Sequence, residues 1–254
     1  MSEELLLELD LGAGIRQLTL NRPEQRNALD SEQWERLTAA LRALAAVGDV
    51  SCLILTGSGT AFASGGDISR FLEEVREPNG PKRFRQRIRE CLDALYDFPA
   101  PTLAKVNGAA IGGGMELALA CDVRVASETA KFSIPAARFG MVMALPDFAR
   151  LAASVGIDRA RFLTMTGAVI DAAQALSMGL VQQAIEPERL DEAALKLARM
   201  LASAEREAAL WFRQAAKLMT QPDAQQSERL RAFEEACLAG LEFQTRVRHV
   251  LSRS

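Results

Sequence analysis

The stretch that decides the fold reads Lys105-Val106-Asn107-Gly108-Ala109-Ala110-Ile111-Gly112-Gly113-Gly114-Met115-Glu116-Leu117. In it an apolar run meets three consecutive glycines, and an apolar, alanine-rich segment follows. Glycines let a backbone approach a ligand closely. A glycine turn that leads into a helix also presents unpaired N–H groups at the positive end of the helix dipole, and such donors can stabilise a developing oxyanion. Glu116 is the one acid of the stretch, about one turn into the predicted helix.

A second segment repeats this arrangement of an apolar strand and a loop of small residues. It reads Leu53-Ile54-Leu55-Thr56-Gly57-Ser58-Gly59-Thr60-Ala61-Phe62-Ala63-Ser64-Gly65-Gly66-Asp67-Ile68. Neither segment matches the dinucleotide-binding fingerprint or the phosphate-binding P-loop. Taken alone, a glycine triplet is also typical of a tight turn, and a glutamate near a helix start is also a favourable dipole partner. Two such loops together can each supply one N–H group to a shared oxygen.

These loops and several further motifs resemble the crotonase superfamily, also called the enoyl-CoA hydratase/isomerase family. The resemblance covers about residues 5 to 190, in the family's order and spacing. Besides the two glycine loops, its motifs are Leu18-Thr19-Leu20-Asn21-Arg22-Pro23-Glu24-Gln25-Arg26-Asn27-Ala28-Leu29, Ala130-Lys131-Phe132-Ser133-Ile134-Pro135, and residues 163–167 and 172–181. Several motifs in register are far more specific than any one of them.

The resemblance implies an α/β fold, a crotonase-type superhelix of ββα repeats. It divides the chain into a core domain that binds acyl-CoA, residues 1–190, and a C-terminal helical region, residues 191–254, which forms a homotrimer or a hexamer made of two trimers. Apolar periodicity predicts strands at 5–9, 15–20, 52–55, 102–106, 123–126 and 181–185. It predicts helices at 31–47, 82–98, 116–120, 147–155, 172–178, 190–204, 207–219 and 227–251. Strands that alternate with helices favour a mostly parallel sheet. Residues 70–86 are predicted to form a mobile loop beside the substrate tail.

The resemblance also implies a role for each loop. The backbone N–H groups of Gly66 and Gly113 form an oxyanion hole for a thioester carbonyl, and Glu116 transfers a proton. Coenzyme A enters as part of the substrate, with no separate cofactor, and the residues implied to contact it are Arg26, Asn27, Ala28, Ser64, Gly65, Asp67 and Ile68. Three basic residues are either phosphate neighbours or a solvated surface: Arg22, Arg26 and Lys105.

The acid–base pattern departs from that of the hydratases, which use two glutamates. Glu116 matches the first, but Ala136 stands where the second is expected, and a methyl group cannot exchange a proton. Ala144 takes a position where dehalogenase relatives place an aspartate. Asp147 is the nearest spare acid, which either faces the site or caps a helix that begins at Phe148. The C-terminal motif departs as well, and Phe243, Arg246 and Arg248 are either substitutes for its CoA contacts or part of an ordinary amphipathic helix.

Three hypotheses follow. The first is an acyl-CoA enzyme of the family in which Glu116 alone moves a proton at the α-carbon. The second is a decarboxylase of a malonyl-type CoA thioester that uses the same site, because decarboxylation needs only an oxyanion hole and one proton donor. The third is a degenerate member that binds CoA esters without turnover. The glycine pair and Glu116 favour an enzyme, whereas Ala136 argues against a standard hydratase.

Composition agrees with this interpretation. The chain has 254 residues and a net charge of −3, which gives no reason to expect nucleic acid as a partner. The four cysteines are widely spaced and are predicted to be reduced core or helix residues of a cytoplasmic protein. His249 is the only histidine of the sequence, which argues against a histidine triad and against a metal site. No apolar run approaches the length of a membrane span, so no membrane association is expected.

Overall fold

The computed structural model describes residues 4–220 and residue 245. Its larger sheet has six strands in the order β1-β2-β3-β5-β7-β10. These strands are β1 (Leu6–Asp10), β2 (Ile15–Leu20), β3 (Cys52–Gly57), β5 (Thr102–Val106), β7 (Val123–Ser127) and β10 (Gln183–Ile185). Strand β1 runs antiparallel to β2, and every other neighbouring pair is parallel. The predicted, mostly parallel α/β arrangement is therefore confirmed.

A smaller sheet of four strands, in the order β4-β6-β8-β9, lies beside the first. Its members are β4 (Ala61–Ala63), β6 (Ala109–Ile111), β8 (Lys131–Ser133) and β9 (Ile170–Asp171). The pairs β4–β6 and β6–β8 are parallel, and β8–β9 is antiparallel. The sequence did not predict these strands, because two or three residues are too few to display an alternating pattern.

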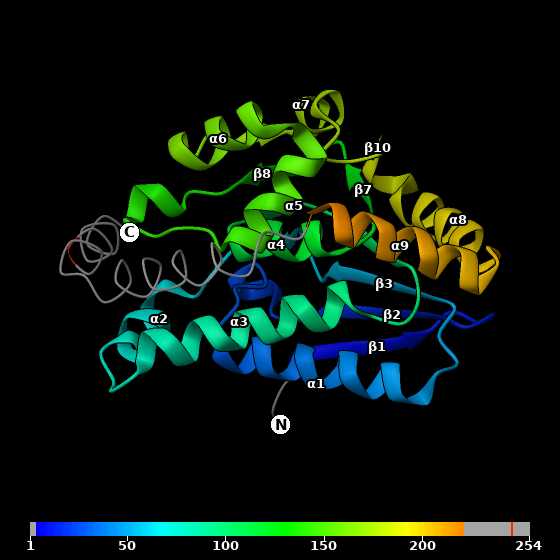
Figure 1. Cartoon of the computed structure of the whole chain (residues 1–254), viewed down its shortest axis with the longest axis horizontal. Helices are drawn as coiled ribbons and strands as arrows, with labels where there is room; N and C mark the ends of the chain where they lie inside the picture. Colours follow the sequence, from blue (N-terminus) through cyan, green and yellow to red (C-terminus); the bar gives the residue numbers. More distant parts are fainter. Residues whose placement is uncertain (1–3, 221–244, 246–254) are drawn as a thin grey trace.

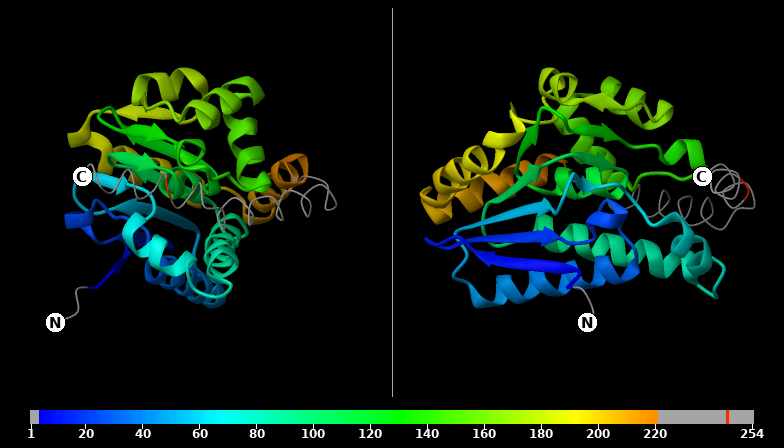
Figure 2. Two further views of the ribbon diagram at one scale, coloured as in Figure 1. Left: turned by 90° about the vertical axis from the view of Figure 1, so that its left-hand side faces the viewer. Right: turned by 180° about the vertical axis from the view of Figure 1, so that it is seen from behind.

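Helices surround both sheets (Figures 1 and 2). They are α1 (Ser31–Val47), α2 (Ile68–Val75), α3 (Gly80–Tyr96), α4 (Gly113–Ala120), α5 (Leu145–Val155), α6 (Ile157–Thr166), α7 (Ala172–Met178), α8 (Leu190–Ala202) and α9 (Arg206–Thr220). Three short 3-10 helices accompany them: η1 (Pro23–Gln25), η2 (Ala136–Phe139) and η3 (Pro187–Arg189). In Figure 1, α1 and α3 run side by side at one edge of the molecule. Helices α8 and α9 overlap in that view but lie apart in the left view of Figure 2.

The larger sheet is covered on both faces because successive side chains of a strand point in opposite directions. On β3, Leu53 and Leu55 belong to the main core, which α1, α3 and α4 complete. Cys52 and Ile54 point the other way, into a second core that α8 closes with Leu190, Ala194 and Ala198. A strand buried on both faces is typical of parallel sheets, and every residue of β3 is buried. The site described below lies on the α1–α3–α4 side.

Residues 70–86 are not a loop, which corrects the prediction. They belong to α2 and α3, joined by a short turn in which Asn79 adopts a left-handed conformation with φ of 60°. The physical reason is apolar burial. Phe71 and Phe84 meet with ring centroids 4.3 Å apart, and Leu72 and Val75 complete a small buried cluster with them. Residues 78–81, which contain two prolines and a glycine, therefore separate α2 from α3 and form the start of α3.

The C-terminal predictions are confirmed in part. The predicted helices at 190–204 and 207–219 correspond to α8 and α9. Of the helix predicted over 227–251 the structure describes only residue 245, and Phe243, Arg246 and Arg248 lie outside the described residues. The division of the chain at residue 190 stays a prediction. Over the described residues, no helix is long and apolar enough to cross a membrane.

Three of the four cysteines are core residues, as predicted. Cys52, Cys91 and Cys121 are free thiols and buried. Burial raises the pKa of the Cys52 and Cys91 thiols to about 12 and raises that of Cys121 as well. Thiols of this kind are protonated at neutral pH and chemically inert. Cys237 lies outside the described residues.

Candidate active site

Three loops converge at one edge of the smaller sheet. Strands β4, β6 and β8 are neighbouring and parallel, so their carboxyl ends lie at the same edge. The loop after β4 carries Gly66, the loop after β6 carries Gly113 and leads to Glu116, and the loop after β8 leads to Ala136. Short strands that the sequence did not reveal therefore bring together the positions that the motifs singled out.

The glycine triplet forms the N-terminus of α4. Gly112 is its N-cap, with φ of 51°, a conformation that favours glycine. Gly113 is tightly packed, because a Cβ there would lie 2.9 Å from Cζ2 of Trp34. Gly114 is equally constrained by Ala63, whose carbonyl oxygen would lie 2.3 Å from an added Cβ. The glycines thus let the helix start press against α1 and β4, with its first N–H groups at the mouth of a cavity.

The loop that carries Gly66 is held by the chain around Leu29. The Leu29 N–H donates to the Gly65 carbonyl oxygen at 2.8 Å, and the Asp67 N–H donates to the Leu29 carbonyl oxygen at 3.1 Å. This bridge fixes both neighbours of Gly66 without using its own N–H. No described residue accepts a hydrogen bond from the N–H of Gly66 or of Gly113. Both donors therefore remain available to a ligand.

Gly66, Gly113 and Glu116 line one cavity of about 320 Å³. Most of the other lining side chains are apolar, and they come from α1, α2, α3, η2 and the segments before and after η2: Trp34, Ile68, Phe71, Phe84, Ile88, Ile134, Phe139, Met141 and Val142. Such a cavity, apolar with a few convergent polar groups, is typical of small-molecule sites. The sequence reasoning missed most of this wall, since nothing local marks which apolar residue faces a cavity.

Glu116 is the one carboxylate among the described residues that line this cavity. Ala136 lines it too, so no acid stands at the position of the expected second glutamate. Asp147 does not replace it: it is buried inside the first turn of α5 and pairs with Arg150 at 2.6 Å. That helix begins at Leu145 and has no side-chain cap, so the prediction that Asp147 caps it is wrong. Arg85, which the sequence reasoning missed, is the one cationic group of the described lining.

Of the residues predicted to contact coenzyme A, three line the cavity: Ser64, Gly65 and Ile68. Asp67 lies just outside. It caps α2 by accepting from the Arg70 N–H at 3.4 Å and faces the adjacent cavity of about 320 Å³ over Asp30 and Glu74. Ala28 is half-buried and Arg26 is exposed, both on the loop that precedes Leu29. These placements bring the predicted residues to one side of the molecule.

Asn27 serves a different purpose from the predicted one. It has no exposed surface, and its side chain bonds to backbone on three sides. Its Oδ1 accepts from the Arg22 N–H at 2.9 Å, and its Nδ2 donates to the carbonyl oxygens of Ser58 and Ala61 at 2.9 and 2.7 Å. These bonds stabilise a turn in which Arg26 and Asn27 both have positive φ. Asn27 therefore braces the loop from inside and does not touch a ligand from this position.

Two of the three candidate phosphate neighbours are also placed elsewhere. The Arg22 guanidinium is buried and donates to Asp30 at 2.9 Å and to the Ala28 carbonyl oxygen at 3.0 Å. Lys105 points to the opposite face of the larger sheet, where it pairs with Asp191 of α8 at 2.5 Å. The phosphate role is therefore wrong for both, and Arg26 remains as the exposed candidate.

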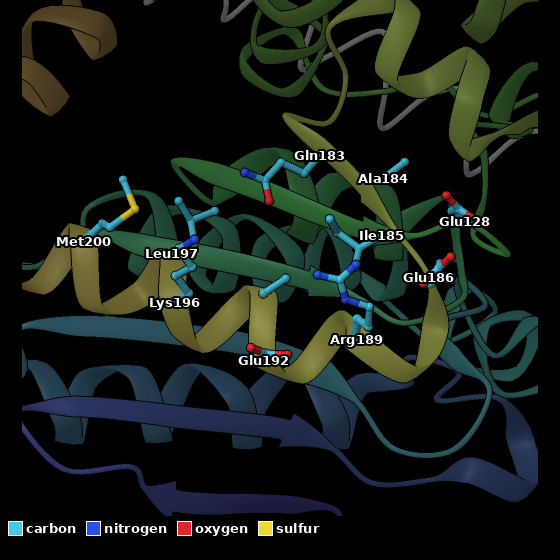
Figure 3. A pocket seen from close by; sticks show the side chains of 11 residues that line it. Glu128, Gln183, Ala184, Ile185, Glu186, Arg189, Glu192, Lys196, Leu197 and Met200 are labelled. Carbon is cyan, nitrogen blue, oxygen red and sulfur yellow. The ribbon is translucent and has the colours of Figure 1, made fainter.

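A further cavity, of about 520 Å³, lies between β10 and α8 (Figure 3). Its lining is rich in exposed charged side chains of both signs, namely Glu128, Glu186, Arg189, Glu192 and Lys196. None of the residues predicted to bind or react with a ligand lines it. No glycine loop lines it, and where the start of α8 does, with its N-cap Arg189 and first-turn Glu192, the lining side chains are charged and exposed.

Comparisons with known proteins agree with this fold. The sequence model described as enoyl-CoA hydratase/isomerase matches residues 10–249. A probable enoyl-CoA hydratase of Rhizobium meliloti is 37% identical over 213 residues, which cover 84% of this chain and 80% of the relative. An enoyl-CoA hydratase/isomerase structure from Pseudoalteromonas atlantica superposes with a TM-score of 0.85 at 29% identity and covers 98% of each chain. A methylmalonyl-CoA decarboxylase structure superposes with a TM-score of 0.86 over 98% of this chain and 96% of the other; at 21% identity it shows the fold alone.

The parallel β strands, the glycine loops at one sheet edge and the single carboxylate in an apolar cavity define a protein of the crotonase fold. With a sequence match over most of its length, the chain belongs to the enoyl-CoA hydratase/isomerase family.

Proposed function

We propose that this protein is an enzyme that forms an enolate from an acyl-CoA thioester and moves a proton at the α-carbon with Glu116. The observation that carries the proposal is the convergence, in one apolar cavity, of two backbone N–H donors without acceptors and one carboxylate. The family match supports acyl-CoA as the substrate class. The binding-only hypothesis would give no reason for a carboxylate among these apolar walls.

In this mechanism the thioester carbonyl oxygen accepts hydrogen bonds from the N–H groups of Gly66 and Gly113. As a proton leaves the α-carbon, negative charge grows on that oxygen, and the charge is lost again when a proton returns to the carbon. Preformed donors stabilise the charged enolate oxygen without reorganising. One such donor is typically worth about 3–4 kcal/mol of transition-state stabilisation. The N-terminal end of α4 adds its dipole at the same point. Glu116, in the first turn of this helix, exchanges the proton.

The choice among family reactions depends on the missing second carboxylate. Hydration needs a proton on the α-carbon and a base that activates water, and Ala136 supplies neither. Isomerisation can proceed with one carboxylate that removes a proton from one carbon and returns it to another. We therefore propose isomerisation, which Glu116 can carry out alone. Hydration is the alternative if a base that does not belong to the described lining activates the water.

Decarboxylation of a malonyl-type thioester is the second candidate, and Ala136 is the observation that favours it. The bond between the α-carbon and the carboxylate carbon breaks, carbon dioxide leaves, and the electron pair forms the enolate held by Gly66 and Gly113. Protonated Glu116 then delivers its proton to the α-carbon and is reprotonated from water. No second acid or base is needed, and an apolar wall favours loss of the charged carboxylate.

The substrate's coenzyme A moiety is proposed to lie along Ser64, Gly65 and Ile68, with Ala28 and Asp67 next to it and Arg26 as the phosphate partner. We also propose that the protein forms a homotrimer, or a hexamer of two trimers. In support, large apolar side chains are exposed on the outer helices, namely Phe162, Met165, Met200, Trp211, Phe212 and Met219. Light scattering coupled to size-exclusion chromatography tests the assembly, and a monomer would contradict it.

A mass-resolved assay of the purified protein tests the proposed reaction. The substrates are short and long 2-enoyl, 3-enoyl and malonyl-type CoA esters. A change of retention time at constant mass identifies isomerisation, gain of water identifies hydration, and loss of carbon dioxide identifies decarboxylation. No change in any ester, with esters still bound by the protein, would contradict the enzyme proposal and leave the binding hypothesis.

A further inference from the structure

Helix α4 can be held in place only from its sides and its C-terminal end, because its N-terminus faces the cavity. That N-terminus has no side-chain cap, and the N–H of Gly113 has no acceptor among the described residues. Apart from Glu116, the side chains of the helix are apolar and buried. Apolar packing is non-directional, so it fixes the position of a helix along its own axis less sharply than hydrogen bonds do. Directional contacts at the C-terminal end can supply that precision.

Asp122, two residues after the end of α4, makes contacts of this kind. One of its carboxylate oxygens accepts from the N–H and the hydroxyl of Thr102, on β5, at 2.7 and 2.9 Å, and its own N–H donates to the Thr102 hydroxyl at 2.9 Å. The other carboxylate oxygen accepts from Nε of Arg213, on α9, at 2.8 Å. The side chains of Asp122 and Arg213 are only 23% and 13% exposed, so water screens this ion pair only in part.

Arg213 bonds to the C-terminal end of α3 as well. Its Nη2 donates to the carbonyl oxygen of Tyr96 at 3.1 Å, and its Nη1 donates to that of Phe98. All three nitrogens of the planar guanidinium therefore have acceptors, in the fixed geometry that this group imposes. Helices α3 and α4 both line the glycine-loop cavity. One side chain of α9 thus joins the rear ends of two elements of the cavity wall.

We propose that Arg213 is a positioning residue for the oxyanion hole: through Asp122 it fixes α4 along its axis and so sets the position of the Gly113 N–H. This inference rests on the proposed function, which requires that donor. Helix α4 has eight residues and is about 12 Å long, so a shift at its rear end carries over to its N-terminus. A misplacement of about 1 Å at the reacting atoms can reduce turnover about a hundredfold. Helix α9 therefore serves the site of its own subunit.

The kinetics of α-proton exchange between 3-hexenoyl-CoA and D₂O test this inference. Arg213→Met keeps a long side chain but loses the three bonds, and we expect kcat and kcat/KM of exchange to fall together by about tenfold, at unchanged KM. An equal fall in both constants indicates that an interaction made only in the transition state has been weakened. Arg213→Lys keeps the charge beside Asp122 and should recover part of the rate.

Lys217→Met is the matched control. It removes the same charge one turn further along α9, where the side chain contacts the end of α3 through Asp97 and the Tyr96 ring. Because both variants lose an ion pair of α9, they should melt at similar temperatures. Only Arg213→Met should lower the exchange rate, which a merely structural role of the two ion pairs does not predict.

A double-mutant cycle tests the route through Asp122. Asp122→Asn keeps an oxygen for Thr102 but removes the charge that pairs with Arg213, so it should lower kcat by a similar factor. The double variant should be no slower than either single one, because both changes remove the same interaction.

Three results would overturn the positioning role and leave the proposed function intact. They are a wild-type rate in Arg213→Met, an equal loss in Lys217→Met, and a double variant that is slower by the product of the two single losses. Exchange by the wild type at no more than the buffer rate contradicts the proposed function itself.

Discussion

The two cavities, one at the glycine loops and one between β10 and α8, differ in what their walls can do. The β10–α8 cavity is larger, about 520 Å³ against 320 Å³, and carries more charge. Its charges sit on exposed side chains of a helix and a strand, where water screens them. The smaller cavity has few polar groups: the backbone N–H donors, the Ser64 hydroxyl, the Glu116 carboxylate and the Arg85 guanidinium. The loop that carries Gly66 is fixed by backbone bonds to Leu29. Convergence of fixed donors therefore indicates chemistry better than volume or charge does.

The charged side chains next to the two cavities also differ, because those behind Gly66 are buried and those of the β10–α8 cavity are exposed. Behind Gly66, the Arg22–Asp30 ion pair has an N–O distance of 2.9 Å and side chains only 6% and 3% exposed. The β10–α8 wall offers instead Arg189, Glu192 and Lys196, all exposed. A buried pair is costly to break, whereas exposed pairs contribute little. Each of the following substitutions tests this contrast, from the largest expected effect to the smallest.

The largest effect is expected at Glu116. Glu116→Gln keeps the shape of the side chain but removes its proton transfer, and turnover should fall about 10²- to 10⁴-fold. The affinity for CoA esters should stay within about twofold, because binding depends on the backbone donors and the apolar wall. Glu192→Gln makes the same change in the β10–α8 cavity and should leave turnover unaltered. Equal losses in both variants would remove the distinction between the cavities.

A large loss of stability is expected at Asp30. This residue caps α1 by accepting from the Gln33 N–H at 2.9 Å and pairs with both Arg22 and Arg70. Asp30→Ala leaves the buried Arg22 guanidinium with only the longer carboxylate contact, to Asp67 at 3.7 Å, so the free energy of unfolding in urea should fall by about 3 kcal/mol.

The control is Glu32→Ala, two residues further on, which removes only an exposed pair with Arg36. Its effect should stay within about 0.5 kcal/mol. If the two variants unfold at the same urea concentration, the loop behind Gly66 is not held by buried charge.

A smaller effect on activity is expected to separate the two glycines of the proposed oxyanion hole. A Cβ on Gly113 would meet the Trp34 ring at 2.9 Å, whereas on Gly66 it would approach only the Leu29 carbonyl oxygen, at 4.0 Å. Gly113→Ala should lower the melting temperature and, by displacing the start of α4, reduce turnover by about tenfold or more. Gly66→Ala should melt within a degree or so of the wild type. A lower melting temperature for Gly66→Ala than for Gly113→Ala would contradict this packing.

The smallest effect is expected at Lys196, in the β10–α8 cavity. Lys196→Gln removes an exposed charge, so its unfolding free energy should change by less than about 0.5 kcal/mol. Its turnover should equal that of the wild type. A loss of turnover at this residue would show that the β10–α8 cavity takes part in the reaction.

The sequence predicted the parts of the site that depend on local backbone requirements. Glycine's specific uses at a helix start and in a close approach singled out the two glycine loops. The resemblance to the family then supplied Gly66 and Gly113 within those loops, and the position of Ala136. The longer strands were found through their apolar runs. The sequence did not predict the features that are set by tertiary packing. These are the strands of two or three residues and the helices within 70–86, where Phe71 and Phe84 bury each other.

Arg85 shows the same limit. It lies in a run with four other basic residues between 82 and 89, a pattern typical of a solvated helix face. Only the placement of α3 against α2 and the loop at Met141 decides which of them faces the cavity. Likewise Asn27 reads as a ligand contact by its motif, yet its three buried bonds make it a brace. Residue type alone does not distinguish these cases.

Exchange of the α-proton tests the central claim most directly, because it requires the oxyanion hole and Glu116 but no particular overall reaction. The protein is incubated with 3-hexenoyl-CoA in D₂O, and mass spectrometry follows deuterium at the α-carbon. We predict exchange well above the buffer rate for the wild type, and a rate about 10²-fold or more lower for Glu116→Gln. Exchange at the buffer rate by the wild type, or equal exchange by both proteins, would contradict the account.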